Sequence, residues 1–466
     1  MEENPALNQT AGLNLCLIEG NWDEGLPKLA AGSDEQLVRV ARDDLAGPTD
    51  AAQRAALADR WWDMSNSEQY AAPGSDAQKQ LRERAAKWWA LARDDLEGDE
   101  KLRVDGMLFR AKSGDGPDPA LLPDLKGLEC RDAKWRPFFL AAFGGNAESE
   151  AAVEGALTWL SQHQQDNGSW NFRHTGPPCN SKCPNPGSLD DAPNVATALA
   201  LLPFFGADHG PYEGPYHECV AKGLRFLQLQ LGKNGSLYDT DAGSFPSQAL
   251  ATLALCEGAQ FSTSRPNWDA ARAALKIVLS TQNSDGGWSA TKPNPGKKPP
   301  ASSIESTYWN AAALATAGQL GLPIPQAALD RARRYLEEAQ QGLPASRTTE
   351  EAAATLGRII LGEPRDHQLL ADYAVRVAAE GPSTDGNLYR NYLQSQLLRD
   401  HGGRPWEAYN ATLRDALLAA QATDGHTAGS WYFSDNGPTT KYGGRLLNTA
   451  LGALLEVYYR NPMPRQ

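Results

Sequence analysis

Basic residues are scarce in this sequence. Its 466 residues include 44 Lys and Arg against 57 Asp and Glu, which gives a net charge of -13. Lys and Arg do not cluster as a phosphate-binding surface requires, so we expect no nucleic-acid partner. No stretch approaches the roughly 18–20 apolar residues of a membrane span, and residues 1–10 lack a basic segment followed by a hydrophobic one. We therefore expect a soluble chain without a visible targeting signal, cytoplasmic by default, or exported if a leader has been removed.

Cysteine is also scarce, and four of the six cysteines are well separated along the chain. Cys179 and Cys183 form a local pair on a proline-rich loop that also carries His174. The His-x4-Cys-x3-Cys spacing permits zinc but supplies three ligands where a structural site needs four, so His217 or Cys219 is a candidate for the fourth. A disulfide between Cys179 and Cys183 is the alternative if the protein is exported. A third interpretation is that the pair does neither.

Ile and Val are few, whereas Ala, Leu and Gly are abundant. This composition favours closely packed helices over sheet. The chain is longer than a single hydrophobic core usually supports, so we expect two domains or one large repetitive one.

The first part of the chain, residues 1–112, reads as a stack of antiparallel helices. Residues 40–45 (Val-Ala-Arg-Asp-Asp-Leu) are echoed by residues 91–96 (Leu-Ala-Arg-Asp-Asp-Leu), and tryptophan pairs stand at 61–62 and 88–89. Large aromatics at such positions lock helical hairpins together. The segment is similar in kind to tetratricopeptide arrays, and we expect it to serve packing or to bind a protein partner. A Gly- and Pro-rich stretch predicts a linker over residues 113–134.

A long-range repeat occupies residues 135–466. It has the frame Leu-x3-Gln-x3-Gly-x-Trp, and its first copy is Leu160, Gln164, Gly168 and Trp170. Further copies are Val278, Gln282, Gly286 and Trp288, and then Leu417, Gln421 and Gly425, where an insertion delays Trp431. Weaker copies fill the gaps, and each copy lies between two helical patterns. About six helix pairs result, a number that can close into a ring.

This frame resembles the repeat of squalene and hopene cyclases, whose wider superfamily includes the β subunits of protein prenyltransferases. The resemblance implies an all-α fold, an α/α toroid of inner and outer helices around a central cavity open at one end. Fold alone does not give activity.

The cyclase resemblance has one candidate for the proton-donating Asp-x-Asp-Asp acid, namely Asp190 and Asp191 in Ser188-Leu-Asp-Asp. Ser188 replaces the first aspartate. Either aspartate is a candidate catalytic acid, and the alternative is that one of them caps the following helix.

Prenyltransferase chemistry is disfavoured. The stretches that should carry an Asp, Cys and His zinc set, 305–310 and 442–449, contain neither Cys nor His. The acidic cluster at residues 94–97 has the wrong spacing to bind a diphosphate through magnesium. The sequence therefore identifies no cofactor.

The N-terminal ends of the inner helices should surround one mouth of the ring, and they are rich in polar and aromatic residues. The candidate ligand-binding residues are Glu305, Tyr308, Trp309, Asn310, Arg347, Tyr389, Arg390, Tyr392, Tyr442 and Arg445. The leading hypothesis is a toroid that binds a hydrophobic or small-molecule ligand or a partner in this mouth, without a complete catalytic motif. The alternatives are a divergent class II terpene cyclase and a polysaccharide hydrolase or lyase with Glu305 and Glu350 as its carboxylates.

Overall fold

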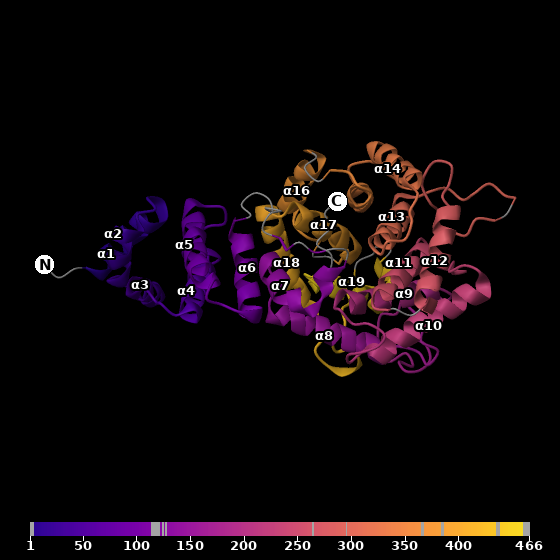
Figure 1. The fold of residues 1–466 in the computed structure, drawn as a ribbon, viewed down its shortest axis with the longest axis horizontal. Coiled ribbons are helices and arrows are strands. Elements are labelled where there is room, and N and C mark those ends of the chain that lie inside the picture. Colours follow the sequence, from indigo (N-terminus) through magenta and orange to yellow (C-terminus); the bar gives the residue numbers. More distant parts are fainter. Residues whose placement is uncertain are drawn as a thin grey trace. The chain divides into compact units, whose positions relative to one another are not determined.

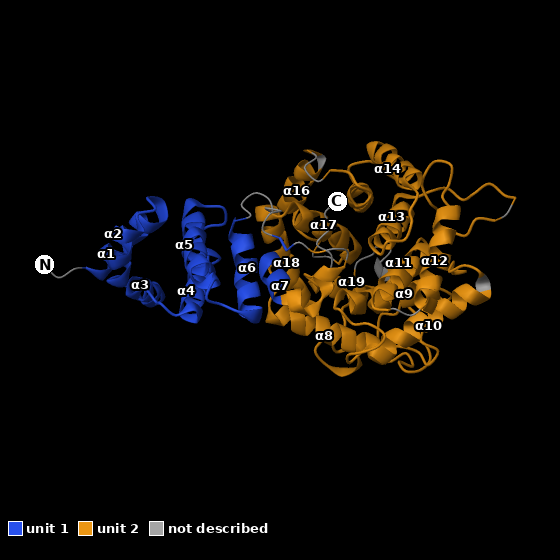
Figure 2. Ribbon diagram, viewed as in Figure 1, with its two compact units in different colours: residues 1–123, 137–143 blue, residues 124–136, 144–466 orange. Residues whose placement is uncertain are grey.

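The structure of the protein is a computed structural model. It describes residues 4–112, 122–123, 125, 128–262, 265–294, 296–364, 368–383, 386–434 and 439–459. Residues 113–121 of the predicted linker lie outside this set. The chain forms two compact units, Met1–Pro123 with Pro137–Phe143 and Asp124–Arg136 with Gly144–Gln466 (Figure 2). Among the described helices, none is both long and apolar enough to cross a bilayer.

The first unit is built from consecutive antiparallel helices. They are α1 (Pro5–Leu13), a π-helical turn (Asn14–Ile18), α2 (Trp22–Ala30), α3 (Glu35–Ala46), α4 (Ala51–Ser65), α5 (Asp76–Arg93), α6 (Gly98–Lys112) and the part of α7 (Arg136–Phe143) from residue 137 onward. Each of the first six packs mainly on its neighbours in sequence, and Phe109 of α6 packs on Phe138 and Phe143 of α7.

One buried carboxylate, that of Asp44, ties these helices together. Asp44 accepts hydrogen bonds from the indole nitrogens of Trp61 (2.7 Å) and Trp88 (3.0 Å), and it forms an ion pair with Arg84. Asp44 belongs to the repeated Arg-Asp-Asp-Leu segment noted above. A carboxylate that is 4% exposed is tolerated only when it is paired in this way. The tryptophan pairs therefore do more than fill space, because they also supply donors to a buried charge.

The second unit is an α/α toroid, as predicted, with six helical hairpins in its described residues (Figure 1). The outer helices are α8 (Ala147–Gln162), α10 (His217–Asn234), α12 (Arg265–Ser280), α14 (Gln326–Gln341), α16 (Gln368–Glu380) and α18 (Gly403–Ala420). The inner helices are α9 (Pro193–Gly206), α11 (Ser247–Gln260), α13 (Ile304–Gln319), α15 (Thr348–Ile360), α17 (Leu388–His401) and α19 (Gly444–Glu456). Each inner helix packs on the next, and α19 returns to α9. Every residue of α9 and α19 is buried or nearly so, which explains their small and apolar composition.

The Gln–Gly–Trp motif has the same geometry in all three clear copies. The indole nitrogens of Trp170, Trp288 and Trp431 each donate at 2.8 Å to a carbonyl of the preceding outer helix. The turn glycines 168, 286 and 429 have φ between 86° and 93° and lie against the backbone of another outer helix, an approach that a side chain would block.

The glutamine of the motif joins neighbouring hairpins. Gln164 donates to the Cys219 carbonyl of α10 at 2.8 Å, and Gln282 donates to the Ala328 carbonyl of α14 at 2.9 Å. Gln421 donates to the Ala152 carbonyl of α8 at 2.7 Å. The last hairpin is therefore joined to the first by the same bond that joins consecutive hairpins. In the last copy of the motif the turn glycine is Gly429 and not Gly425, because the Gln421 side chain donates to the Gly429 carbonyl.

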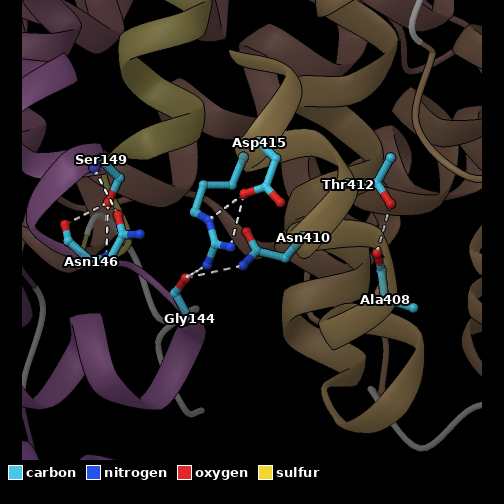
Figure 3. Close-up of polar contacts among 8 residues, drawn as sticks. Gly144, Asn146, Ser149, Ala408, Asn410, Thr412 and Asp415 are labelled. Atoms are coloured by element: carbon cyan, nitrogen blue, oxygen red, sulfur yellow. Dashed lines mark hydrogen bonds and ion pairs between the residues drawn. The ribbon is translucent and has the colours of Figure 1, made fainter. Parts of the chain in front are cut away.

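A second set of bonds supports this closure. Asn146 and Ser149 form a capping box at the start of α8. The Gly144 carbonyl, just before that cap, faces Asn410 of α18 and accepts hydrogen bonds from Asn410 (3.4 Å) and Arg414 (2.9 Å) (Figure 3). We call the contact between the first hairpin (α8 and α9) and the last (α18 and α19) the seam.

Candidate functional site

A cavity of about 320 Å³ opens at the mouth of the ring, where the inner helices begin. It is lined by the N-terminal ends of α11, α13, α15 and α17. The lining residues are Ser244, Phe245, Pro246, Glu305, Trp309, Arg347, Thr349, Glu350, Asn387 and Tyr389. Several of these positions begin helices: Pro246, Arg347 and Asn387 are N-cap residues. The ends of four helices therefore converge on one space of the size that small-molecule sites occupy.

Two glutamates and one arginine set the charge of the cavity. The Arg347 guanidinium lies 2.8 Å from the Glu350 carboxylate. Burial raises the pKa of Glu305, the neighbouring Glu350 charge raises it further, and Arg347 partly offsets both effects. The two carboxyl groups therefore lie in different environments, since the pKa of Glu305 is raised by burial whereas Glu350 is ion-paired with Arg347.

Aromatic rings form one wall of the cavity. Trp309 stacks on Tyr389 with ring centroids 6.2 Å apart, and on Tyr392 with centroids 5.9 Å apart. Tyr308 lies behind Trp309 and is fully buried. The Tyr389 hydroxyl is buried without a hydrogen-bond partner. It is a donor that can serve a molecule entering the cavity.

The structure brings Glu305, Trp309, Arg347 and Tyr389 of the predicted mouth residues together in this cavity. The other six predicted residues do not line the cavity. Asn310 donates to the Ser306 carbonyl within its own helix, and the Arg390 amide is capped by Asn387. Arg445 belongs to the seam, where it donates to the Pro184 carbonyl, and the Tyr442 carbonyl accepts the Ser188 amide nearby. That the four cavity residues bind a ligand stays a prediction.

Sequence reasoning missed Ser244, Phe245, Pro246, Thr349 and Asn387 as lining residues. These residues share one feature that the sequence could have revealed, which is that each lies just before or at the start of an inner helix. Asn387 is also recognisable as an N-cap, because its side chain accepts the amide of Arg390 three residues later.

Asp190 and Asp191 are exposed residues of the loop before α9. The Asp190 side chain is 72% exposed and pairs with Arg173 at 3.2 Å. Neither aspartate caps α9. That role belongs to Asp239 of the next hairpin, which accepts the amides of Asn194 (3.0 Å) and Val195 (2.9 Å). Burial raises the pKa of Asp239 to about 7 despite these two bonds.

Cys179 and Cys183 are both buried and carry free thiols, so the alternative of a disulfide between them is not what the structure shows. With His163 and His426 they form a group whose ligand atoms lie within 4.8 Å of one another. The residues beside the two cysteines are therefore His163 and His426, and not the His217 or Cys219 expected from the sequence. His174 lies next to this group without belonging to it, with its ring centroid 5.8 Å from that of His163.

No family model matches this sequence, and no curated protein matches it either. Among solved structures, the α-1,6-mannanase GH76A of Salegentibacter sp. HEL1_6 is similar at a TM-score of 0.46 and 11% identity, covering 67% of this chain and 98% of that one. An inactive variant of that enzyme in complex with α-1,6-mannotriose gives the same values. A second inactive variant, in complex with α-1,6-mannotetrose, gives a TM-score of 0.45 with 68% and 99% coverage. The toroid of this chain is defined by its own helix contacts, independently of these similarities.

Proposed function

We propose that the mouth cavity binds a saccharide and that Glu305 and Glu350 act on it as acid and base. The observation that carries this proposal is the placement of two glutamates in different charge environments within one aromatic-walled cavity.

Cleavage of a glycosidic bond needs a carboxylic acid that donates a proton and a carboxylate that acts as a base or nucleophile. Glu305 fits the first role, because burial and the neighbouring Glu350 charge raise the pKa of its carboxyl group. Glu350 fits the second, since the Arg347 guanidinium at 2.8 Å compensates a negative charge there. In this assignment Glu305 protonates the leaving oxygen and Glu350 activates water or attacks the sugar.

The remaining lining fits a sugar better than an isoprenoid. Ser244, Thr349 and Asn387 offer hydroxyl and amide partners, and Phe245 with Trp309 gives apolar walls for C–H faces. A volume of about 320 Å³ lies at the lower end of the range for small-molecule sites and suits one or two sugar units.

A terpene cyclase is less well supported. Its acid must protonate an alkene in a dry chamber, whereas Asp190 is 72% exposed and paired with Arg173. The charged residues of the mouth cavity would also have to be desolvated to accept a hydrocarbon.

The proposal is tested by incubating the full chain with a panel of α- and β-linked glycans and measuring new reducing ends, with ligand-observed NMR to record binding. We expect at least one glycan to bind and be cleaved. Glu305→Gln and Glu350→Gln should each lower the rate by about 100- to 10,000-fold. The Asp190→Asn, Asp191→Asn double variant is the matched control and should retain the rate. Loss of activity in that control with retention in Glu305→Gln would reassign the acid, and binding of no saccharide would refute the proposal.

A further inference from the structure

We propose that the ring carries a zinc site with two thiolate and two imidazole ligands. The bound zinc ion would link the first and last hairpins at the seam. The four ligands are His163, Cys179, Cys183 and His426. Their donor atoms come from the end of α8, the loop that follows it and the turn after α18. Two thiolates and two imidazoles form a donor set that suits zinc in a closed tetrahedral site.

The geometry is close to that of a bound site. A tetrahedral zinc ion with bonds of about 2.0 and 2.3 Å holds its donor atoms about 3.3–3.8 Å apart. The His163 Nε2 and Cys183 Sγ atoms are already 3.2 Å apart. The widest pair of the group, within 4.8 Å, needs to close by about 1 Å.

The His163 imidazole is held in the orientation that a ligand requires. Its Nδ1 lies 2.7 Å from the Trp159 carbonyl oxygen, which can only accept, so Nδ1 carries the proton. Nε2 is therefore left with a free lone pair directed toward Cys183. A histidine that donates its second nitrogen to a backbone carbonyl is the usual outer support of a metal ligand.

One cationic side chain lies beside the loop that carries the two cysteines. The Arg445 side chain donates to the carbonyl of Pro184, the residue after Cys183, at 3.2 Å. It also donates to the Ser430 hydroxyl at 2.9 Å, which fixes the guanidinium beside the residue that follows Cys183. A zinc ion with two thiolates and two neutral imidazoles has no net charge, so this arginine does not oppose it.

Two irregularities of the repeat are explained by this site. His163 stands directly before the motif glutamine, where the other two clear copies have Thr281 and Ala420. The tryptophan follows the glutamine by six residues in the first two of these copies, but by ten in the last, from Gln421 to Trp431. The added residues carry His426. Both departures from the repeat thus bring a histidine to the same point of the seam.

The consequence is a metal bridge between parts of the chain that lie far apart in sequence. The loop that carries Cys179 and Cys183 already contacts the last hairpin through backbone bonds, such as the Arg445 amide to the Asn185 carbonyl at 3.0 Å. Zinc adds a restraint to these bonds without replacing them. We therefore expect the apo ring to fold and the bound ring to have a more rigid seam.

The site is tested on the full chain, reduced and stripped of metal, by titration with Co²⁺ and then Zn²⁺. We expect one Co²⁺ per chain with the visible bands of tetrahedral coordination and a thiolate charge-transfer band, both lost when Zn²⁺ displaces it. Bound Zn²⁺ should protect Cys179 and Cys183 from alkylation and slow amide exchange in residues 163–192 and 421–434 at least tenfold. Wild-type protein that gives no tetrahedral spectrum would overturn the proposal.

The variant His426→Ala identifies the ligand set, because His426 is exposed and its removal leaves the core intact. It should weaken Co²⁺ binding at least 100-fold. His217→Ala is the matched control on α10 and should keep the wild-type spectrum and affinity. An unchanged spectrum and affinity in His426→Ala would overturn the proposal even if the chain binds cobalt elsewhere.

Discussion

The Gln421 side chain donates a hydrogen bond to the Ala152 carbonyl at 2.7 Å, although the two residues are 269 positions apart. The same side-chain nitrogen donates to the Gly429 carbonyl at 2.9 Å. Gln164 makes the equivalent pair of bonds, to Gly168 and Cys219, between consecutive hairpins. Closure of the ring thus uses the same pair of glutamine bonds that joins consecutive hairpins.

Replacing Gln421 with Met should loosen the seam. The apolar side chain preserves the volume but leaves the Ala152 and Gly429 carbonyls without their donor, at a cost of about 1–3 kcal/mol. Hydrogen exchange measured by mass spectrometry should become faster in α8 and α19. Gln164→Met removes the same bonds from the joint of the first two hairpins, and its effect should centre on α10. Identical exchange patterns in the two variants would contradict a seam closed by Gln421.

The Asp44→Ala substitution should strongly destabilise the first unit. It leaves Arg84 without its buried counter-ion and two indole nitrogens, of Trp61 and Trp88, without their acceptor. Removing one partner of a buried pair costs about 3–5 kcal/mol. Urea unfolding followed by tryptophan fluorescence measures this loss.

Asp43 provides the control for that variant. It pairs with Arg60 at 2.6 Å, and its side chain is 50% exposed. Exposed pairs contribute about 0–1 kcal/mol, so Asp43→Ala should barely change the urea midpoint. Equal losses in the two variants would show that the buried position of Asp44 is not what matters.

The repeat could be predicted from the sequence because its bonds are local. In Gln164 to Trp170 the glutamine bonds the glycine carbonyl four residues later, and the tryptophan bonds a carbonyl ten residues earlier. Such contacts impose a fixed spacing, which is visible without knowledge of the fold. The same logic predicted that the inner helices would present their N-terminal ends at one mouth, where Glu305 and Tyr389 do lie.

Contacts between segments that lie far apart in the sequence could not be predicted in this way. Asp239 caps a helix of the preceding hairpin, and Arg131 pairs with Glu257 at 3.1 Å across 126 residues in a fully buried site. Each partner taken alone is an ordinary charged residue, and a single sequence does not say which distant charge it meets. His426 is an intermediate case, since the insertion that carries it was visible but its destination was not.

The pH profile of the proposed glycoside cleavage should respond to Arg347. An acid catalyst is active while protonated, so the rate falls as pH rises through the pKa of Glu305. Because Arg347 lowers that pKa, Arg347→Met should move the alkaline limb of the profile to higher pH. Glu350→Gln removes a charge that raises the pKa of Glu305, and its residual activity should show the opposite displacement. If the alkaline limbs of Arg347→Met and Glu350→Gln move in the same direction, Glu305 is not the acid.

The buried carboxyl group of Glu456 should make the toroid less stable as pH rises. Burial raises its pKa to about 8, so between about pH 5 and pH 8 the folded state keeps a proton that the unfolded state has released. Raising the pH through this window therefore lowers the free energy of unfolding, by up to roughly 4 kcal/mol at 1.36 kcal/mol per pKa unit. Glu456→Gln mimics the protonated form and should remove this loss.

Urea unfolding of both proteins at pH 5 and pH 8 measures the difference. The variant should match the wild type at pH 5 and exceed its stability at pH 8. At pH 8 the wild type must either bury a charged Glu456 carboxylate or keep this group protonated while the unfolded chain releases the proton. Glu148→Gln, on the exposed first turn of α8, is the control for loss of one negative charge and should leave the wild-type slope unchanged. If Glu456→Gln shows the wild-type slope, folding does not raise the pKa of the Glu456 carboxyl.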